Sequence, residues 1–111
     1  MKKLVVQISN NLLFVNPQDI ILITRKERKT VIYTVEGTTL AINEPLGRLE
    51  QLLDGESFFR CHRGYIINVG MVKEFNPYGN KTYTAKLMNT DETALITVEK
   101  AKEFRQRYCI E

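Results

Sequence analysis

Short runs of β-branched, aromatic and other apolar residues recur along almost the whole chain, separated by polar or turn-forming residues. Runs of about four to eight such residues are typical of strands. They predict about ten strands, over residues 4–8, 12–15, 19–24, 30–35, 38–42, 58–61, 65–68, 71–75, 82–88 and 93–97. The run at 19–24 is almost entirely apolar, so we expect that strand to be covered on both faces.

Two segments have the spacing of amphipathic helices instead. In the first, leucines recur on one face, at Leu46, Leu49, Leu52 and Leu53. Asn43 is a candidate N-cap ahead of Pro45, which the first turn of a helix tolerates, and Gly55 is expected to end the helix. We expect this short helix to cover a sheet and to make no functional contact.

The second helix is expected to begin at Val98, with the hydroxyl of Thr97 as its N-cap. Ala101, Phe104 and Tyr108 then share one face, which is suited to packing on the strands. The chain is therefore predicted to be mainly β, with one short central helix and a C-terminal helix. Residues 1–111 are expected to form a single domain, because the length suits one core and no linker or repeat interrupts the pattern.

Turn-forming residues occupy the segments between the predicted strands. A loop is expected at 16–19, a two-residue turn at 36–37, and further turns at 76–81 and 89–91. The basic run at 25–29, Arg-Lys-Glu-Arg-Lys, interrupts the apolar pattern. Two interpretations of this run are open: a hairpin tip that is simply solvated, and a loop that contacts phosphates.

Composition excludes several classes of protein. Of the 111 residues, 43% are hydrophobic and 26% are charged, which is ordinary for a folded domain in water. No apolar run approaches the ~20 residues of a membrane span, and the N-terminal run is too short for a signal peptide, so we expect a cytoplasmic protein without membrane contact. The net charge of +3 is modest, but basic residues gather at 25–29 and 99–107, whereas 44–56 is acidic. That distribution is compatible with a surface that is positive on one side.

The chain has two cysteines, Cys61 and Cys109, and one histidine, His62. Their spacing matches neither a disulfide framework nor a metal site, so we expect reduced thiols, no metal and no cofactor. Cys61 and His62 are adjacent, and neighbours on a strand point to opposite faces, which disfavours a nucleophile–base pair. The sequence also contains no glycine-rich phosphate loop, so we do not expect an enzyme.

The most informative stretch is 58–68, which reads Phe-Phe-Arg-Cys-His-Arg-Gly-Tyr-Ile-Ile-Asn. Two apolar strands flank His62-Arg63-Gly64, and glycine permits the unusual backbone angles of a tight reversal. This arrangement predicts a cationic tip, rich in hydrogen-bond donors, between two apolar anchors. Arginine at such a tip suits guanine edges or phosphate oxygens. Strand alternation places Cys61 on the same side as Phe59, which predicts its burial.

The stretch resembles the signature of the LytTR domain, the DNA-binding output module of many bacterial response regulators of two-component systems. The family pattern F-x-R-x-H-R-S-Y-(I/V)-V-N is matched at Phe58, Arg60, His62, Arg63, Tyr65, Ile66 and Asn68. Gly64 replaces serine and Ile67 replaces valine. The order of apolar strand, hairpin, leucine-rich helix and signature strand is also similar, although 19–23 has no aromatic residue. The resemblance implies an elongated, mainly β domain of short, mostly antiparallel strands.

The resemblance further implies that loops and strand ends, rather than a recognition helix, enter the major groove of DNA at three regions. The expected DNA-binding residues are Arg63, His62, Arg25, Lys26, Arg28, Thr97, Lys100, Lys102, Asn80 and Lys81. For His62 two roles are open, a direct contact and a bond to the backbone of the turn. The third region lacks the usual arginine, because Val98 and Glu99 follow Thr97, so its lysines are expected to hold phosphates.

The resulting hypothesis is a transcriptional regulator domain that binds double-stranded DNA in a sequence-specific manner. The resemblance implies paired direct repeats occupied by two copies, a monomer in solution, and control by a receiver or sensor domain. Some family members respond to cysteine oxidation, so a redox role of Cys61 is the alternative to an inert thiol. The alternative function is a β-rich module that binds protein or single-stranded nucleic acid, because five tyrosines could stack on bases.

Overall fold

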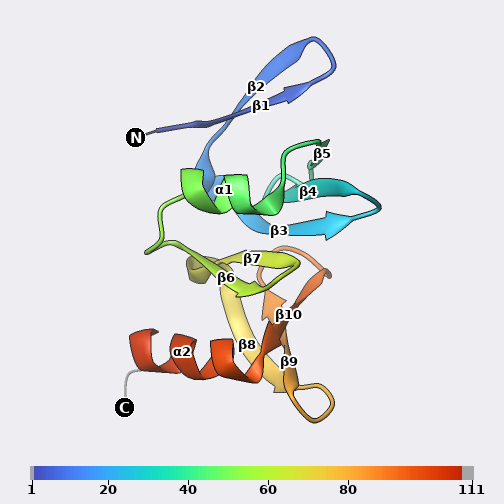
Figure 1. The fold of residues 1–111 in the computed structure, drawn as a ribbon. Coiled ribbons are helices and arrows are strands. Elements are labelled where there is room, and N and C mark those ends of the chain that lie inside the picture. The colour runs from blue at the N-terminus through green and yellow to red at the C-terminus, as the bar shows by residue number, and fades with distance from the viewer. Residues whose placement is uncertain (1, 109–111) are drawn as a thin grey trace.

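The elements follow one another as the sequence pattern predicts. The structure is a computed structural model and describes residues 2–108, in which ten strands and two α-helices are found (Figure 1). The strands are β1 Leu4–Ile8, β2 Asn11–Val15, β3 Ile20–Lys26, β4 Lys29–Thr34, β5 Thr39–Ile42, β6 Phe58–His62, β7 Tyr65–Asn68, β8 Val72–Pro77, β9 Thr82–Leu87 and β10 Thr93–Thr97. The helices are α1 Leu46–Leu52 and α2 Val98–Tyr108. Neither α-helix is long and apolar enough to cross a membrane.

The strands form three antiparallel sheets, stacked along the long axis of a body that measures 46 × 31 × 24 Å. The central sheet has the order β5-β4-β3-β7-β6. The hairpin β1-β2 and helix α1 cover one face of it, and the sheet β10-β9-β8 with helix α2 lies against the other (Figure 1). The mainly β, elongated architecture predicted from the sequence is therefore confirmed.

Strand β3 lies in the middle of the central sheet and is buried on both faces because a core covers each face of that sheet. Ile20 and Ile23 belong to the core beneath β1-β2 and α1, called the first core below, whereas Ile21 and Leu22 belong to the core on the α2 side, called the second core. Two consecutive residues face the same core because the pairing with β4 shifts register between Ile20 and Leu22. The prediction that this apolar run is covered on both faces is confirmed.

Three leucines of the predicted α1 stripe are buried as expected, but Leu52 is 51% exposed, and the predicted ends of the helix were wrong. Leu46, Leu49 and Leu53 are buried in the first core. The N-cap position is occupied by Pro45 in an extended conformation, with no side-chain cap, and not by Asn43. The helix ends at Leu52, and the chain is already extended at Leu53, before Gly55 is reached. The extended backbone at Leu53 places this side chain in the core, and its burial favours the early end of the helix.

Helix α2 begins where the sequence predicts it. The Thr97 hydroxyl accepts a hydrogen bond from the backbone N–H of Lys100 at 3.1 Å, so Thr97 is the expected N-cap. Ala101 and Phe104 pack against the second core. The Phe104 ring lies edge-on to the rings of Phe59 and Phe75, with centroids 5.5 and 4.9 Å apart. This contact ties α2 to strand β6, which carries the signature.

Two short 3-10 helices replace segments that were predicted otherwise. Pro17–Asp19 forms one within the predicted loop 16–19, and Val69–Met71 forms the other, so β8 begins at Val72 rather than at residue 71. Each helix follows an asparagine whose side-chain oxygen accepts a hydrogen bond from the backbone N–H two residues later: Asn16 from Gln18, and Asn68 from Gly70. The Asn68 amide also donates to the Ile20 carbonyl at 2.8 Å, which joins the end of the signature to the central strand.

Candidate nucleic-acid interface

The signature forms a hairpin of β6 and β7 that reverses at Arg63-Gly64. The pairing shifts register between Arg60 and His62, so Cys61 is the extra residue of a bulge. The Arg63 side chain is exposed at the tip. Gly64 is not among the residues with positive φ, and a Cβ there would meet the His62 ring only at 3.6 Å. The prediction that this reversal uses the special backbone freedom of glycine was wrong, and a serine could take the position.

His62 is bonded within this tip. Its Nδ1 atom accepts a hydrogen bond from the backbone N–H of Gly64 at 3.0 Å, and its ring lies edge-on to Tyr65. Partial burial, followed by the charges of Arg63 and Arg60, lowers the pKa of His62 below its usual range. A neutral ring with an accepting Nδ1 carries its proton on Nε2. The structural role considered for His62, a bond to the backbone of the turn, is therefore present in the geometry.

The basic run at 25–29 forms the tip of the β3–β4 hairpin. Its two-residue turn consists of Glu27 and Arg28, which both have positive φ, as in the tight turns that suit the twist of a hairpin. The side chains diverge from there. Arg25 donates to the Thr30 hydroxyl at 2.9 Å, whereas Tyr33 and then Glu92 raise the pKa of the exposed Lys26.

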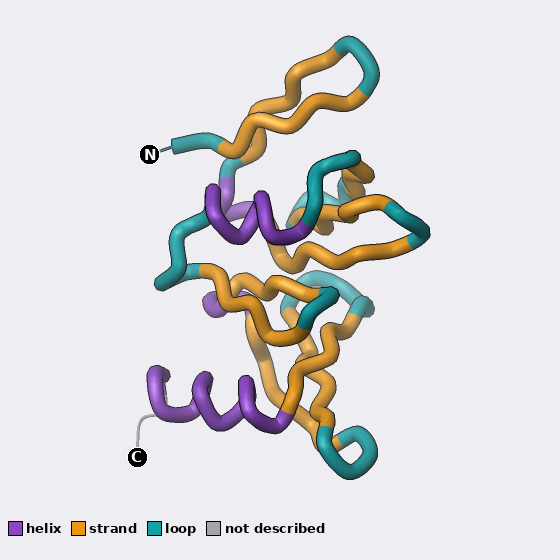
Figure 2. Tube along the Cα trace, viewed as in Figure 1, coloured by secondary structure: helices purple, strands orange, loops and turns teal. Residues whose placement is uncertain are grey.

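A backbone hydrogen bond joins these two basic tips. The N–H of Arg25 donates to the carbonyl of Gly64 at 3.1 Å, next to the paired residues Thr24 and Tyr65. The central sheet therefore presents the β3–β4 and β6–β7 tips side by side, toward the same side of the molecule (right in Figures 1 and 2). Loop segments of this kind, fixed by a rigid sheet, are typical positions for binding residues.

The third region lies at the junction of β10 and α2. The N–H of Val98 donates to the carbonyl of Lys81 at 3.2 Å, so the exposed turn with Asn80 and Lys81 lies beside Thr97 and the start of α2. In Figure 2 this turn also lies on the side of the two hairpin tips. Strand β10 contacts β6 and β7 directly, which fixes the junction relative to the signature hairpin.

The two candidate lysines of α2 are not brought together. Lys100 forms an ion pair with Glu103 at 3.4 Å, and its Nζ lies 5.8 Å from the centre of the Phe59 ring, so it faces β6. Lys102 lines a groove of about 580 Å³ between α2 and β8, together with Val72 and other apolar residues. The two side chains therefore belong to different sides of the helix.

Residues 10–108 match the LytTr DNA-binding domain family. The chain belongs to the LytTR family. It is 28% identical over 93 residues to the sensory transduction protein LytT of Oceanobacillus iheyensis, covering 84% of this chain and 38% of that protein. It is 33% identical over 81 residues to the transcriptional regulatory protein YpdB of Escherichia coli K12, covering 72% of this chain and 32% of that protein. The chain thus spans well under half the length of these relatives.

A solved structure of a LytTr DNA-binding domain from Bacillus cereus has the same fold. The TM-score is 0.78 at 25% identity, over 96% of this chain and 95% of that one. This LytTR domain is therefore the DNA-binding module of a family of transcriptional regulators, as the signature at 58–68 predicted.

Cys61 of this LytTR domain lies beneath the signature tip with none of its surface exposed. Its Sγ lies 3.3 Å from the Leu95 carbonyl of β10 and 3.8 Å from the Tyr65 carbonyl. Burial raises the pKa of the Cys61 thiol to about 12. The burial predicted from strand alternation is confirmed, and the environment favours the inert thiol over the redox role. Cys109 lies outside the described residues.

We expect Cys61 to react very slowly with a thiol reagent while the protein is folded. In a Cys109→Ser variant, Cys61 is the only thiol, and its labelling at pH 8 should be slower than in urea by on the order of a thousandfold, because the thiolate is the reacting species. The absorbance change of Ellman's reagent measures both rates. Equal rates in the folded and unfolded chain would restore a redox role for Cys61.

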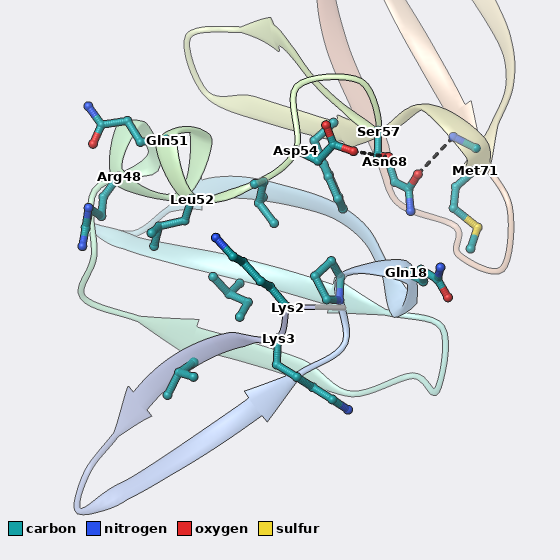
Figure 3. Close-up of a pocket in the computed structure, with 16 residues that line it drawn as sticks. Lys2, Lys3, Gln18, Arg48, Gln51, Leu52, Asp54, Ser57, Asn68 and Met71 are labelled. Atoms are coloured by element: carbon teal, nitrogen blue, oxygen red, sulfur yellow. Dashed lines mark hydrogen bonds between the residues drawn. The ribbon is translucent and has the colours of Figure 1, made fainter.

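A groove on the opposite edge of the molecule escaped the sequence analysis. It has a volume of about 1020 Å³ and is lined by the end of α1, the N-terminal segment and the 3-10 helix near Met71 (Figure 3). Lys2 and Arg48 lie at its rim, and Leu52, which is 51% exposed, faces into it. None of the ten candidate DNA-binding residues lines this groove, so it is separate from the edge that carries the tips.

Proposed function

We propose that this LytTR domain recognises double-stranded DNA by placing its basic hairpin tips in the major groove. The observation that carries the proposal is the hydrogen bond between the Arg25 N–H and the Gly64 carbonyl. It holds two cationic hairpin tips side by side at the strand ends of a rigid sheet. The major groove distinguishes all four base pairs, and any rigid element with well-placed donors can read it.

The tips divide naturally into a base-reading position and phosphate-binding positions. We assign base recognition to Arg63, which is exposed and extends from an ordered turn. His62 supports that turn and reaches DNA only through its Nε2 edge. Lys26 and Arg28 are proposed phosphate contacts, whereas the Arg25 guanidinium, bonded to Thr30, contributes mainly by positioning the tip.

The third region is proposed to hold the phosphate backbone. Asn80 and Lys81 extend beside the start of α2, where the helix N-terminus favours an anion next to Thr97. Lys100 and Lys102 are proposed as phosphate contacts that contribute less to affinity, since they lie on different sides of α2. Together with the two hairpin tips, this region would follow the DNA backbone over successive grooves.

We further propose that residues 1–111 act as one DNA-binding unit in the bacterial cytoplasm. Two copies are proposed to occupy paired direct repeats, as monomers that meet on DNA, under the control of a receiver or sensor domain. The relatives, which are sensory transduction and transcriptional regulatory proteins, are more than twice as long as the matched segment and so have room for such a domain.

The alternative of a base-stacking surface has little support in the geometry. Tyr33, Tyr65 and Tyr83 pack against the second core, and Tyr108 packs on Phe104. Tyr78 is the exposed tyrosine, at 63%. A surface for single strands needs several aromatic rings in a row, and these five tyrosines do not supply one.

Selection of bound duplexes from a random pool tests the proposal. We expect a short motif to be enriched twice in the same orientation, with centres about two helical turns, ~21 base pairs, apart, because one copy that contacts successive grooves already covers more than one turn. Affinity for the selected duplex should fall steeply with salt and exceed that for either single strand. An unchanged pool, or tighter binding to the single strand, would contradict double-stranded recognition.

A further inference from the structure

We propose that Arg60 and Glu50 form a clamp that holds the Arg63 tip in its DNA-binding shape. Both are then positioning residues for DNA recognition and neither is a DNA contact. The inference rests on the proposed role of Arg63. It assigns a task to the one basic residue of the signature that the ten candidate DNA-binding residues leave out.

The Arg60 side chain folds back onto the tip that follows it. Its Nε donates to the His62 carbonyl at 3.0 Å, and its Nη2 donates to the Arg63 carbonyl. The planar guanidinium is suited to this task because its donors are fixed relative to one another. The bulge between Arg60 and His62 interrupts the ladder of β6 and β7 at this point, so side-chain donors replace part of the regular pairing.

Glu50 supplies the second half of the clamp. Its Oε1 accepts a hydrogen bond from Arg60 Nη1 at 2.8 Å, so all three nitrogens of the guanidinium donate a hydrogen bond. Glu50 lies on α1 beside Leu49, which is anchored in the first core. The carboxylate therefore extends from a helix that is fixed in the core. Its bond to Arg60 restricts the movement of the Arg63 tip.

The charges around Arg60 make Glu50 its natural partner. A cavity of about 290 Å³ between α1, β6 and α2 is lined by Arg60, Lys100 and Arg107, together with Glu50 and Glu103. Glu103 already pairs with Lys100 at 3.4 Å and with Arg107 at 3.7 Å. Glu50 is thus the carboxylate left to offset Arg60, and its removal would leave three cations and one carboxylate around this cavity.

The clamp and His62 together order the backbone of the tip before DNA arrives. Side chains of the signature bond the carbonyls of His62 and Arg63 and the N–H of Gly64, while the Arg63 guanidinium remains exposed. A recognition loop that is already ordered loses less conformational entropy on binding, which increases affinity without any added contact.

For Glu50→Gln, net charge and the clamp predict opposite changes in the affinity for DNA. The substitution raises the net charge by one, and long-range electrostatics alone would then strengthen binding to DNA. Glutamine can offer Arg60 only a weaker, neutral hydrogen bond, so the weakened clamp should instead lower the affinity, by about two- to tenfold, because the tip loosens. Glu56→Gln is the matched control: it makes the same charge change on an exposed carboxylate that forms no ion pair within residues 2–108.

The experiment measures fluorescence anisotropy of the selected duplex with the whole chain at several salt concentrations. We expect Glu50→Gln to weaken binding and Glu56→Gln to leave it equal or tighter. Arg60→Gln should weaken binding by about tenfold. The slope of the logarithm of the binding constant against the logarithm of the salt concentration should equal that of the wild type, since no phosphate contact is lost. If Glu50→Gln strengthens binding as Glu56→Gln does, or Arg60→Gln lowers the slope by about 1, the clamp is refuted.

Amide hydrogen exchange without DNA separates failure of the clamp from failure of the proposed function. The amides of Arg63 and Gly64 should exchange about tenfold faster in Glu50→Gln than in Glu56→Gln, whereas amides in the buried strand β3 should be unchanged. Unchanged exchange at the tip would refute the clamp whatever the DNA result. If the two variants show this exchange difference but the wild-type protein binds no duplex, the proposed function is refuted and the clamp stands.

Discussion

Arg63→Ala is expected to weaken binding to the selected duplex by about 1–3 kcal/mol, roughly 5- to 150-fold, and to relax the preference at one base position. The reason is that an arginine on an ordered tip can make two hydrogen bonds to one guanine, and alanine leaves those acceptors unpaired. Anisotropy titrations with the selected duplex and with single-base variants of it measure both effects.

Arg48→Ala is the matched control for this prediction. Arg48 is also an exposed arginine, but it lies on α1 at the rim of the groove on the opposite edge. Its loss removes the same charge and should change affinity only slightly, with the base preference intact. Equal effects of Arg63→Ala and Arg48→Ala would mean that Arg63 contributes charge alone and reads no base.

Ile23→Ala is expected to lower the free energy of unfolding by about 2–5 kcal/mol. Ile23 has none of its surface exposed, and on β3 it pairs with Ile32 of β4 and Ile66 of β7. Alanine would leave a cavity between the central sheet and α1, which the surrounding strands cannot fill without breaking their register. Urea unfolding followed by circular dichroism measures the change.

Leu12→Ala is the control for the stability prediction. Leu12 is 60% exposed on the outer face of the β1–β2 hairpin, so its truncation should cost less than about 0.5 kcal/mol. A similar loss in both variants would mean that the hairpin is packed in solution in a way that this structure does not contain. A small loss for Ile23→Ala would mean that the central sheet tolerates a void at its middle strand.

The domain consists of a rigid β scaffold and the polar tips that it carries. The scaffold is stiff because β3 is buried on both faces and is joined to its neighbours by paired strands. The tips are polar and exposed, so burial of apolar surface does not order them. Arg60 Nε and Arg25 N–H donate hydrogen bonds to the backbone of the signature tip, and His62 Nδ1 accepts one from it.

Local pattern predicted most strands because each alternates or runs apolar over its own length. It also predicted Thr97 as a cap, since a hydroxyl before a helical stripe needs no distant partner. It failed at Asn43, Gly55 and residue 71. Helix α1 ends where Leu53 enters the core, and the start of β8 depends on Asn68, whose side chain bonds to the carbonyl of the distant Ile20. Propensity carries no information about such distant partners.

The sequence by itself determined the family, the mainly β fold and the burial of Cys61, because each follows from a motif or from alternation within one segment. Only the tertiary structure decided which basic residues act together. It joined Arg25 to Gly64, separated Lys100 from Lys102, and bonded Arg60 to Glu50 from a different element. Residues far apart in the chain meet only when sheets and helices pack, so their separation along the sequence does not predict their distance in space.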